Sequence, residues 1–414
     1  MIPFSTFTLD NGLRVIVHED PTVQIAVINI LYDVGSRDER PDKTGFAHLF
    51  EHLMFGGSVN IPNYDEPLQM VGGENNAFTN TDITNYYLTV PASNLETGFW
   101  LESDRMLSLS FEPKVLEVQR KVVIEEFKQR YLNQPYGDVW LKLRPLAYHT
   151  HPYQWATIGK EISHIENATM DDVKDFFFTH YIPNNAILVV AGNVTLDQVK
   201  KLSEKWFGPI PAGNKHVRNL PVEPRQENKR TLSVNAKVPA HALYKCYHMP
   251  GRFDKEYFAA DLLSDILSRG QSSRLYNQLV KDKEIFTSIS SFAMGSLDPG
   301  MLVISGRLKN GISPEVAEQE VDRVVKAFVS EGPKSDELQK VKNQAQTTME
   351  FEKVEVINRA MNLAFAALSG DADLVNQESK KIEAVSREDI METATQIFDE
   401  KNSSVLYYHA ESLN

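Results

Sequence analysis

The chain has 414 residues, 42% of them hydrophobic and 24% charged, and a net charge of −13. This length favours about two to four domains, the composition is that of a soluble globular protein, and the acidic balance excludes a broad basic face for nucleic acid. The single cysteine, Cys246, excludes an internal disulfide and fits a reducing compartment. The N-terminus has no signal-peptide pattern, and the longest apolar runs are too short to span a bilayer. We therefore expect a cytoplasmic protein without membrane insertion, unless a leader has been trimmed from the sequence.

The first third of the sequence opens with strand patterns and continues with a helix pattern. Residues 6–10 and 13–18 flank Asn11-Gly12, which predicts a β-hairpin. Residues 45–55 have apolar side chains at helical spacing behind Thr44, where we expect the helix N-cap. The pattern continues with a strand at 23–34, a hairpin formed by 75–79 and 85–90, helices at 95–109, 113–131 and 170–179, and a strand at 186–191.

A weak internal repeat predicts the domain organisation. Residues 181–185, which precede one strand pattern, resemble residues 398–402, which precede another and lie 217 positions later. The proline- and glycine-rich stretch 209–224 separates the two halves and predicts a linker. We therefore predict an α+β fold with two homologous domains, 1–208 and 225–414, each a mixed or antiparallel sheet with helices packed on one face.

The segment His48-Leu49-Phe50-Glu51-His52 is the strongest chemical signal. In a helix, His48 and His52 lie on one face, so their imidazole nitrogens can bind one ion. Glu51 lies beside that face and can act as a general base without coordinating the metal. This H-x-x-E-H order is the reverse of the H-E-x-x-H zinc signature. In a metal-free core, these polar groups would be costly to bury. A second histidine pair, His149 and His151, lies in a proline-flanked loop that favours a plain turn.

A third ligand must come from another element, because a catalytic zinc usually takes three protein ligands. The helix at 113–131 offers Glu117, Glu125 and Glu126. On a helical wheel, Glu126 falls within the apolar arc and Glu125 just beyond its edge, so periodicity favours Glu126 without excluding Glu125. The side chains that define this arc are those of Val115, Leu116, Val118, Val122 and Val123.

These motifs resemble the pitrilysin family of inverted-zincin peptidases, in the branch of similarly sized chains that includes mitochondrial processing peptidase and bacterial homologues. The resemblance covers essentially the whole chain and rests on TGFAHLFEHLMFGGS, on GGENNAFTNTDITNYYLTVP and on the helix that ends in VVIEE. It implies that Glu126 is the third ligand of one Zn2+ per chain. It also implies that the strand around Asn75, Asn76 and Ala77 pairs with the backbone of a peptide substrate; an ordinary sheet strand is the alternative.

Two departures from the family pattern affect what the resemblance implies. The family has a supporting glutamate seven residues before the metal glutamate. This chain has Gln119 there, whose amide can still support the site by a hydrogen bond to a ligand but brings no charge. The family also supplies an arginine and a tyrosine, which hold the substrate and the developing oxyanion, after a Ser-Arg-Leu motif. Here that motif is residues 273–275, and the two expected positions hold Val280 and Thr287. We therefore expect a heterodimer with a homologous partner subunit that supplies this pair, or alternatively a homodimer.

The second half also differs from the first at the motif itself. Asp265, Ser268 and Arg269 stand where His48, Glu51 and His52 would repeat, so we expect no zinc site there. The resemblance as a whole implies a zinc-dependent endopeptidase in which Glu51 moves the proton. A non-catalytic structural subunit of the same fold is the alternative, and the intact motif argues against it. A small-molecule metallohydrolase has no pocket motif in its support.

Overall fold

A computed structural model describes residues 1–214 and 217–411, and the chain separates into two compact units. Each unit is built from three segments. Unit 1 contains Met1–Gln129, Trp155–Leu220 and Glu350–Gln377, and unit 2 contains Arg130–Gln154, Pro221–Met349 and Glu378–Asn414. Both units combine one sheet with several helices, so the α+β fold with two homologous domains is confirmed.

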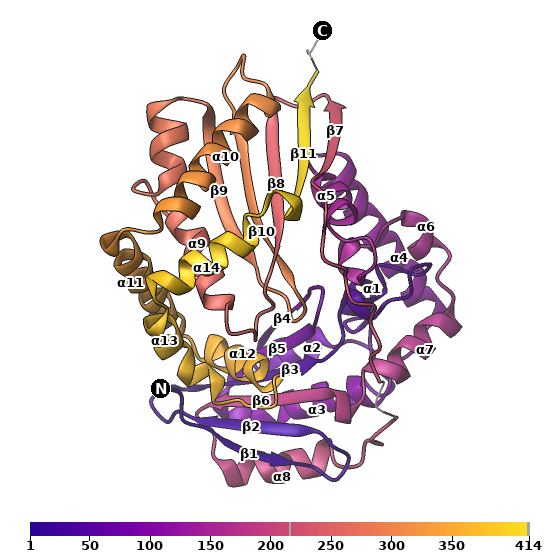
Figure 1. The fold of residues 1–414 in the computed structure, drawn as a ribbon. Helices are drawn as coiled ribbons and strands as arrows, with labels where there is room; N and C mark the ends of the chain where they lie inside the picture. The colour runs from indigo at the N-terminus through magenta and orange to yellow at the C-terminus, as the bar shows by residue number, and fades with distance from the viewer. Residues whose placement is uncertain (215–216, 412–414) are drawn as a thin grey trace. The chain divides into compact units, whose positions relative to one another are not determined.

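Unit 1 is built on a six-stranded mixed sheet (Figure 1). Both hairpins predicted from the sequence are present, and β2 and β6 form the parallel pair. In spatial order the strands are β1 (Ser5–Thr8), β2 (Arg14–Glu19), β6 (Ala186–Gly192), β3 (Ile25–Tyr32), β5 (Thr84–Pro91) and β4 (Glu74–Thr79). Strand β4 therefore lies at the edge of the sheet. The helices are α1 (Phe46–Leu53), α2 (Asp65–Met70), α3 (Leu95–Leu107), α4 (Pro113–Phe127), α6 (Ile162–Glu166), α7 (Met170–His180), α8 (Leu196–Trp206) and α12 (Val356–Ala367).

Unit 2 repeats this arrangement with five strands. Their spatial order is β7 (Arg230–Ala236), β11 (Ser403–Ala410), β8 (Ala242–Met249), β10 (Gly300–Leu308) and β9 (Phe286–Met294). Strands β7 and β11 are parallel, as are β2 and β6 in unit 1. The helices are α5 (Val139–Ala147), α9 (Tyr257–Ser268), α10 (Pro314–Glu331), α11 (Ser335–Glu352), α13 (Leu374–Ala384) and α14 (Arg387–Ile397), with α11 and α13 extending across the unit boundaries.

The spacing of equivalent elements confirms the duplication. Strand β3 begins at Ile25 and β8 at Ala242, and β6 begins at Ala186 and β11 at Ser403. Both intervals equal the 217-residue offset found in the sequence. Helices α7 and α14 are related by the same interval. The two sheets therefore descend from one α+β pattern with the same strand order.

One helix from each half of the sequence belongs to the unit that is built mainly from the other half. Helix α12 lies in the second half of the sequence, but its buried face, which includes Ala360 and Leu363, packs with Val27 and Val189 of the unit 1 sheet. Helix α5 lies in the first half and packs on β8 and β11 of unit 2. Neither unit is therefore one continuous stretch of sequence, whereas the predicted domains end at 208 and begin at 225. The reason is that helical periodicity identifies an apolar face but not the sheet that the face will cover.

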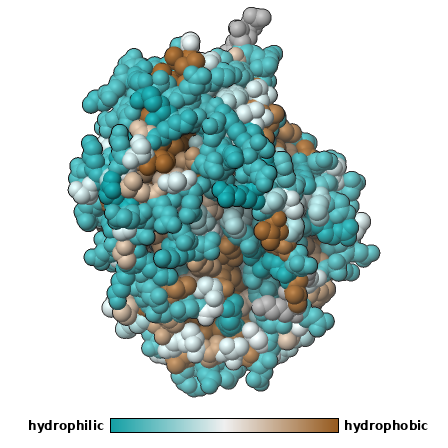
Figure 2. Space-filling model, in the orientation of Figure 1, coloured by the Kyte–Doolittle hydropathy of each residue, from teal (hydrophilic) through white to brown (hydrophobic). Residues whose placement is uncertain are grey.

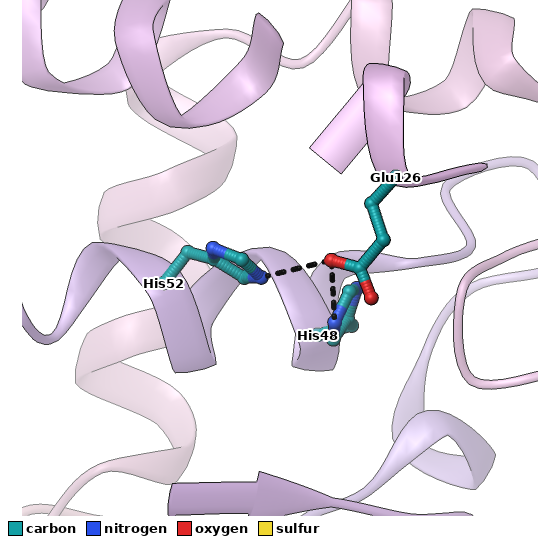
Figure 3. Close-up of side chains that lie close together, drawn as sticks. All are labelled: His48, His52 and Glu126. Carbon is teal, nitrogen blue, oxygen red and sulfur yellow. Dashed lines mark ion pairs between the residues drawn. The ribbon is translucent and has the colours of Figure 1, made fainter. Parts of the chain in front are cut away.

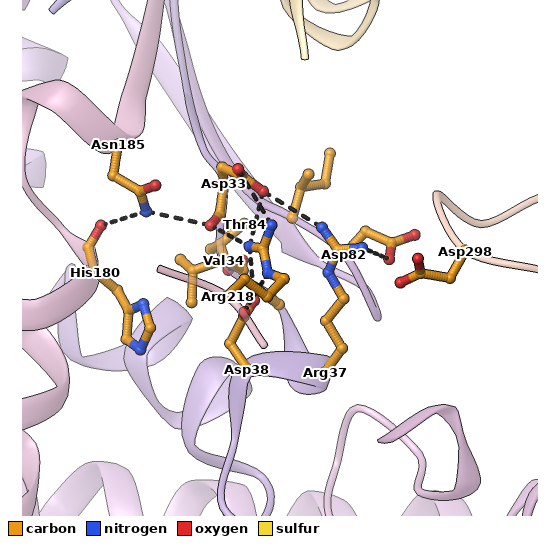
Figure 4. Close-up of polar contacts among 12 residues, drawn as sticks. Asp33, Val34, Arg37, Asp38, Asp82, Thr84, His180, Asn185, Arg218 and Asp298 are labelled. Atoms are coloured by element: carbon orange, nitrogen blue, oxygen red, sulfur yellow. Dashed lines mark hydrogen bonds and ion pairs between the residues drawn. The ribbon is translucent and has the colours of Figure 1, made fainter. Parts of the chain in front are cut away.

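The predicted linker, residues 209–224, has no helix or strand in its described part and is anchored at two points. In unit 1, the Arg218 guanidinium donates to carboxylate oxygens of Asp33 and Asp38 at 2.9 and 2.7 Å (Figure 4). In unit 2, the Glu223 carboxylate accepts the backbone amides of residues 149–151 at 2.8–2.9 Å. At this crossing, the chain passes from unit 1 to unit 2 within the few residues between Arg218 and Glu223.

Hydrophilic residues dominate the face of the molecule drawn in Figure 2, and apolar residues form separate small patches there. Across the part of the chain that the structure describes, no helix is both long and apolar enough to cross a bilayer. Cys246 is buried on β8, where burial raises the pKa of its thiol to about 12.

Candidate metal centre

Helix α1 presents the H-x-x-E-H motif on the side that faces away from its apolar contacts. Phe46, Leu49, Phe50 and Leu53 are buried, whereas the motif side chains remain partly accessible. The ring of Phe50 stacks on that of Tyr181 at 5.2 Å between centroids. These apolar contacts fix the rotation of the helix about its axis and therefore the direction of the motif.

The start of α1 differs from the prediction. Gly45, with a φ of 88°, occupies the N-cap position, and the prediction of Thr44 as N-cap is wrong. The free amides of the first turn donate instead to the buried carboxylate of Glu39, from Gly45 at 2.9 Å and from Ala47 at 2.8 Å. A carboxylate at a helix N-terminus also interacts favourably with the helix dipole. Glu39 gave no signal in the sequence, because it lies six residues before the N-cap Gly45 rather than adjacent to the helix.

The structure brings His48, His52 and Glu126 together (Figure 3). Glu126 Oε2 lies 3.7 Å from His48 Nε2 and 3.4 Å from His52 Nε2. Two atoms that each lie about 2.0–2.1 Å from one tetrahedral zinc are about 3.3–3.4 Å apart. The side chains are 13%, 23% and 17% exposed, respectively, so the site is open on one side. Two imidazoles and one carboxylate in this arrangement fit a zinc ion that retains a position for water.

Burial distinguishes Glu126 from the other two carboxylates on α4. Glu125 is 59% exposed and pairs with Lys128, and Glu117 is 50% exposed and pairs with Arg120. The apolar arc that predicted Glu126 is only partly correct, because Val118 and Val122 are exposed. Leu116, Val123 and Phe127 form the buried stripe, and Glu126 lies beside it.

Glu51 lies between the candidate ligands and strand β4. Burial raises the pKa of its carboxyl, and contacts with Thr79 of β4 and with His52 oppose part of this effect. A partly buried carboxyl beside a metal position is suited to exchange protons with water. Gln119, which was predicted to support the site, is half-buried two helical turns before Glu126.

The predicted substrate strand is an edge strand, and some of its backbone hydrogen-bonding groups point away from the sheet. Asn80 donates its amide to the Ile83 carbonyl at the hairpin turn. The antiparallel register then directs the amides of Asn75 and Ala77 away from β5. The Ala77 amide donates to the side-chain oxygen of Asn76 at 2.8 Å, and the Asn75 side chain donates to Asp65 at 2.9 Å. An added peptide strand would find its main-chain partners on this edge.

The Ser-Arg-Leu motif and the two positions discussed after it serve the packing of unit 2. Arg274 donates to Glu337 at 2.7 and 2.9 Å, and its guanidinium lies 4.6 Å from the centre of the Phe328 ring. Val280 packs against the unit 2 core, and the Thr287 hydroxyl donates to the Arg307 carbonyl.

The second histidine pair, His149 and His151, belongs to the loop whose backbone amides donate to the Glu223 carboxylate. Among the described residues, the only His, Cys, Asp or Glu group with metal-binding spacing is the one formed by His48, His52 and Glu126.

Comparisons with known proteins also distinguish the first half of the chain, which has the candidate metal site, from the second half. Residues 14–157 match the model of the insulinase family (peptidase family M16), and residues 167–345 match the model of the peptidase M16 inactive domain. The sequence is 31% identical to the zinc protease PqqE of Helicobacter pylori over 360 residues, which cover 85% of this chain and 78% of that protein. It is 26% identical to the uncharacterized zinc protease YmxG of Bacillus subtilis over 400 residues, which cover 95% of each chain.

Solved structures extend the similarity to the fold. A crystal structure of a protease from Helicobacter pylori superposes with a TM-score of 0.92 at 27% identity and covers 99% of this chain and 100% of that chain. The structure of pitrilysin superposes with a TM-score of 0.79 at 17% identity and covers 99% of this chain but 45% of that chain.

Proposed function

The chain belongs to peptidase family M16, the insulinase or pitrilysin family, and from this premise we propose that it is a zinc-dependent endopeptidase that hydrolyses extended or unfolded peptides. The observation that carries this proposal is the convergence of His48, His52 and Glu126 beside Glu51 and an open edge strand. Each feature has a separate role in peptide hydrolysis, and all of them lie in unit 1.

The residues of unit 1 provide for binding and proton transfer. A zinc ion held by His48, His52 and Glu126 would act as a Lewis acid that lowers the pKa of water and polarises a carbonyl group. Strand β4 would bind the substrate backbone and place one peptide bond beside α1. Glu51 would accept a proton from the attacking water and donate it to the leaving amine, which is general acid–base catalysis by one carboxyl group.

A homologous partner subunit completes the proposal. The substrate-holding arginine and tyrosine of related enzymes correspond to Val280 and Thr287, which offer neither a cation nor a phenol. The match to only 45% of the pitrilysin chain supports a pairing of two shorter chains. A partner would then supply the arginine and the tyrosine near the zinc, and a homodimer of this chain would lack them.

Hydrolysis of an internally quenched peptide by the purified chain, with and without a homologous partner, tests this proposal. We expect one zinc per chain, weak activity alone, a large increase with the partner, and loss of activity with a chelator that added Zn2+ reverses. High turnover by the chain alone would refute the need for a partner. A chain that binds zinc poorly and gains no activity with any homologue would support a structural subunit instead.

A further inference from the structure

A buried ion pair lies behind the metal-binding helix and has no place in the proposed chemistry. Glu102 and Arg105, one turn apart on α3, are each 1% exposed. The Arg105 guanidinium donates to both carboxylate oxygens of Glu102 at 2.6–2.9 Å, and the Tyr64 hydroxyl donates to the same carboxylate at 2.5 Å. The Glu102 carboxylate is thus hydrogen-bonded within unit 1, Arg105 Nη1 is buried without a hydrogen-bond partner, and the pair is inaccessible to any substrate.

The guanidinium is enclosed by three aromatic rings. Its central carbon lies 4.4 Å from the ring centre of Tyr86, 4.6 Å from that of Tyr64 and 5.3 Å from that of Phe55. Phe55 also packs edge-on against Tyr64. A planar cation at these distances is attracted to the ring faces and restricts how the rings can move.

Two of these rings belong to residues that are bonded to the last turn of α1. The Phe55 amide donates to the His52 carbonyl at 3.2 Å, and the Tyr86 hydroxyl donates to the Phe50 carbonyl at 3.3 Å. That turn carries Glu51 and His52. Tyr86 also lies opposite Ala77 in the pairing of β5 with the edge strand β4. Arg105 therefore contacts, through one residue each, the helix end that bears the motif and the strand beside it.

We infer that the Glu102–Arg105 pair is a positioning device that sets the orientation of His52 and Glu51; this inference rests on the proposed function for its catalytic part. Stability alone does not account for the pair, because replacing a buried ion pair with apolar side chains is often neutral or stabilising. Loss of an outer partner that orients a metal ligand typically costs about 10–100-fold in metal affinity or activity. We assign that role to Arg105 and Glu102, acting through Phe55 and Tyr86.

The test compares three variants of the full chain. Arg105→Met leaves Glu102 buried without its partner, and Glu102→Leu/Arg105→Met replaces the pair with apolar groups. Lys245→Met is the matched control, since Lys245 pairs with Glu318 in unit 2 at 2.6 Å and is as deeply buried. The measurements are the thermal midpoint, Zn2+ affinity by chelator competition, and kcat and KM with the quenched peptide in the presence of the partner.

We expect the double variant to recover the thermal midpoint lost by Arg105→Met, yet to bind Zn2+ about 10–100-fold more weakly and to lose kcat with KM within about threefold. Lys245→Met should lose stability with unchanged Zn2+ affinity. A double variant with wild-type Zn2+ affinity and kcat would overturn the inference, as would a wild-type chain that binds no Zn2+. If the wild type binds Zn2+ without hydrolysing peptides, the peptidase proposal fails, and the affinity measurements still decide whether Arg105 positions His52.

Discussion

Helices α1 and α9 occupy the same place in the two units but satisfy their polar side chains in opposite ways. On α9, Asp265 pairs with Arg269 at 2.7 Å. The Ser268 hydroxyl donates to the Ser291 carbonyl of β9 and accepts the Ser291 amide, at 2.8 and 2.5 Å. The polar positions of α9 thus find their partners within unit 2.

On α1, the same three positions hold His48, Glu51 and His52. The two histidines lie at the carboxylate of Glu126 from another helix, and Glu51 contacts Thr79 of β4. The neighbouring edge strand differs as well. Strand β9 is bonded to Ser268, whereas the outward amide of Ala77 on β4 is covered only by the side chain of its neighbour Asn76. A few side chains on a duplicated scaffold therefore distinguish a potential reaction site from a structural contact.

The largest expected effect comes from changing the proposed base on α1 and its counterpart on α9. Glu51→Gln removes the group that accepts the proton, so we expect kcat to fall by at least about 10²–10⁴-fold. Zinc should remain bound, because Glu51 is not a ligand, and elemental analysis measures this. Ser268→Ala, at the equivalent position of α9, should leave kcat unchanged. A Glu51→Gln variant with near wild-type turnover would remove the chemical difference between the two helices.

The candidate metal site can be tested by two adjacent carboxylates on α4. Glu126→Gln replaces a charged ligand by a weak neutral one, so we expect Zn2+ affinity to fall by more than the roughly 10–100-fold that loss of an outer partner costs. Glu125→Gln removes an exposed carboxylate and should leave the affinity unchanged. His48→Ala should lose the metal as well. Equal affinities of Glu126→Gln and Glu125→Gln, measured by chelator competition, would contradict the assignment of Glu126.

The sequence predicted the elements that carry the motif better than their packing partners. The hairpin at Asn11-Gly12, the helix around His48 and the 217-residue repeat follow from local patterns, and all are present. The placement of α5 in unit 2 and of α12 in unit 1 depends on tertiary packing, which no local pattern encodes. The same holds for the Glu39 cap, whose carboxylate reaches the helix only after the intervening loop has folded.

The candidate site was predictable only where spacing within one helix determines geometry. His48, Glu51 and His52 lie on one turn, so their relation follows from helical periodicity. Glu126 was preferred over Glu125 because it resembles the family pattern, and the structure adds the distances that bring it to the histidines. Arg105 gave no signal, because a buried ion pair is indistinguishable in sequence from an exposed pair three residues apart on a helix.

A third prediction concerns stability and its dependence on pH in α9. Burial raises the pKa of Asp261 to about 6, and the neighbouring Asp265 adds to this effect while Arg252 and Arg269 oppose it. The folded state therefore holds a proton that the unfolded state releases above its ordinary pKa of 3.8, and stability falls as the pH rises from about 4 to 6. We expect Asp261→Asn to raise the free energy of unfolding by about 2–3 kcal/mol at pH 8 and by nothing near pH 3.5.

Denaturant unfolding at the two pH values measures this effect. Asp265→Asn is the matched comparison and should gain less at pH 8, because burial also raises the pKa of the Asp265 carboxyl but the hydrogen bond and charge of Arg269 oppose that shift. A pH-independent difference between Asp261→Asn and the wild type would show that ionisation of Asp261 is not the cause. The result would sharpen the comparison, since a helix without metal chemistry would still carry a buried acid at a cost to stability.

The smallest expected effect tests whether β4 is an open edge in function as well as in geometry. Ala77→Pro removes one outward amide without touching the hydrogen bonds between β4 and β5, because the Ala77 amide points away from β5. One lost main-chain hydrogen bond to a substrate is worth about 1 kcal/mol, so KM should rise about fivefold with kcat largely retained. Asn76→Ala frees the same amide from its neighbour's side chain and should leave KM unchanged or lower it. If Ala77→Pro leaves KM unchanged, with zinc content and thermal midpoint unaltered, the substrate does not pair with this edge.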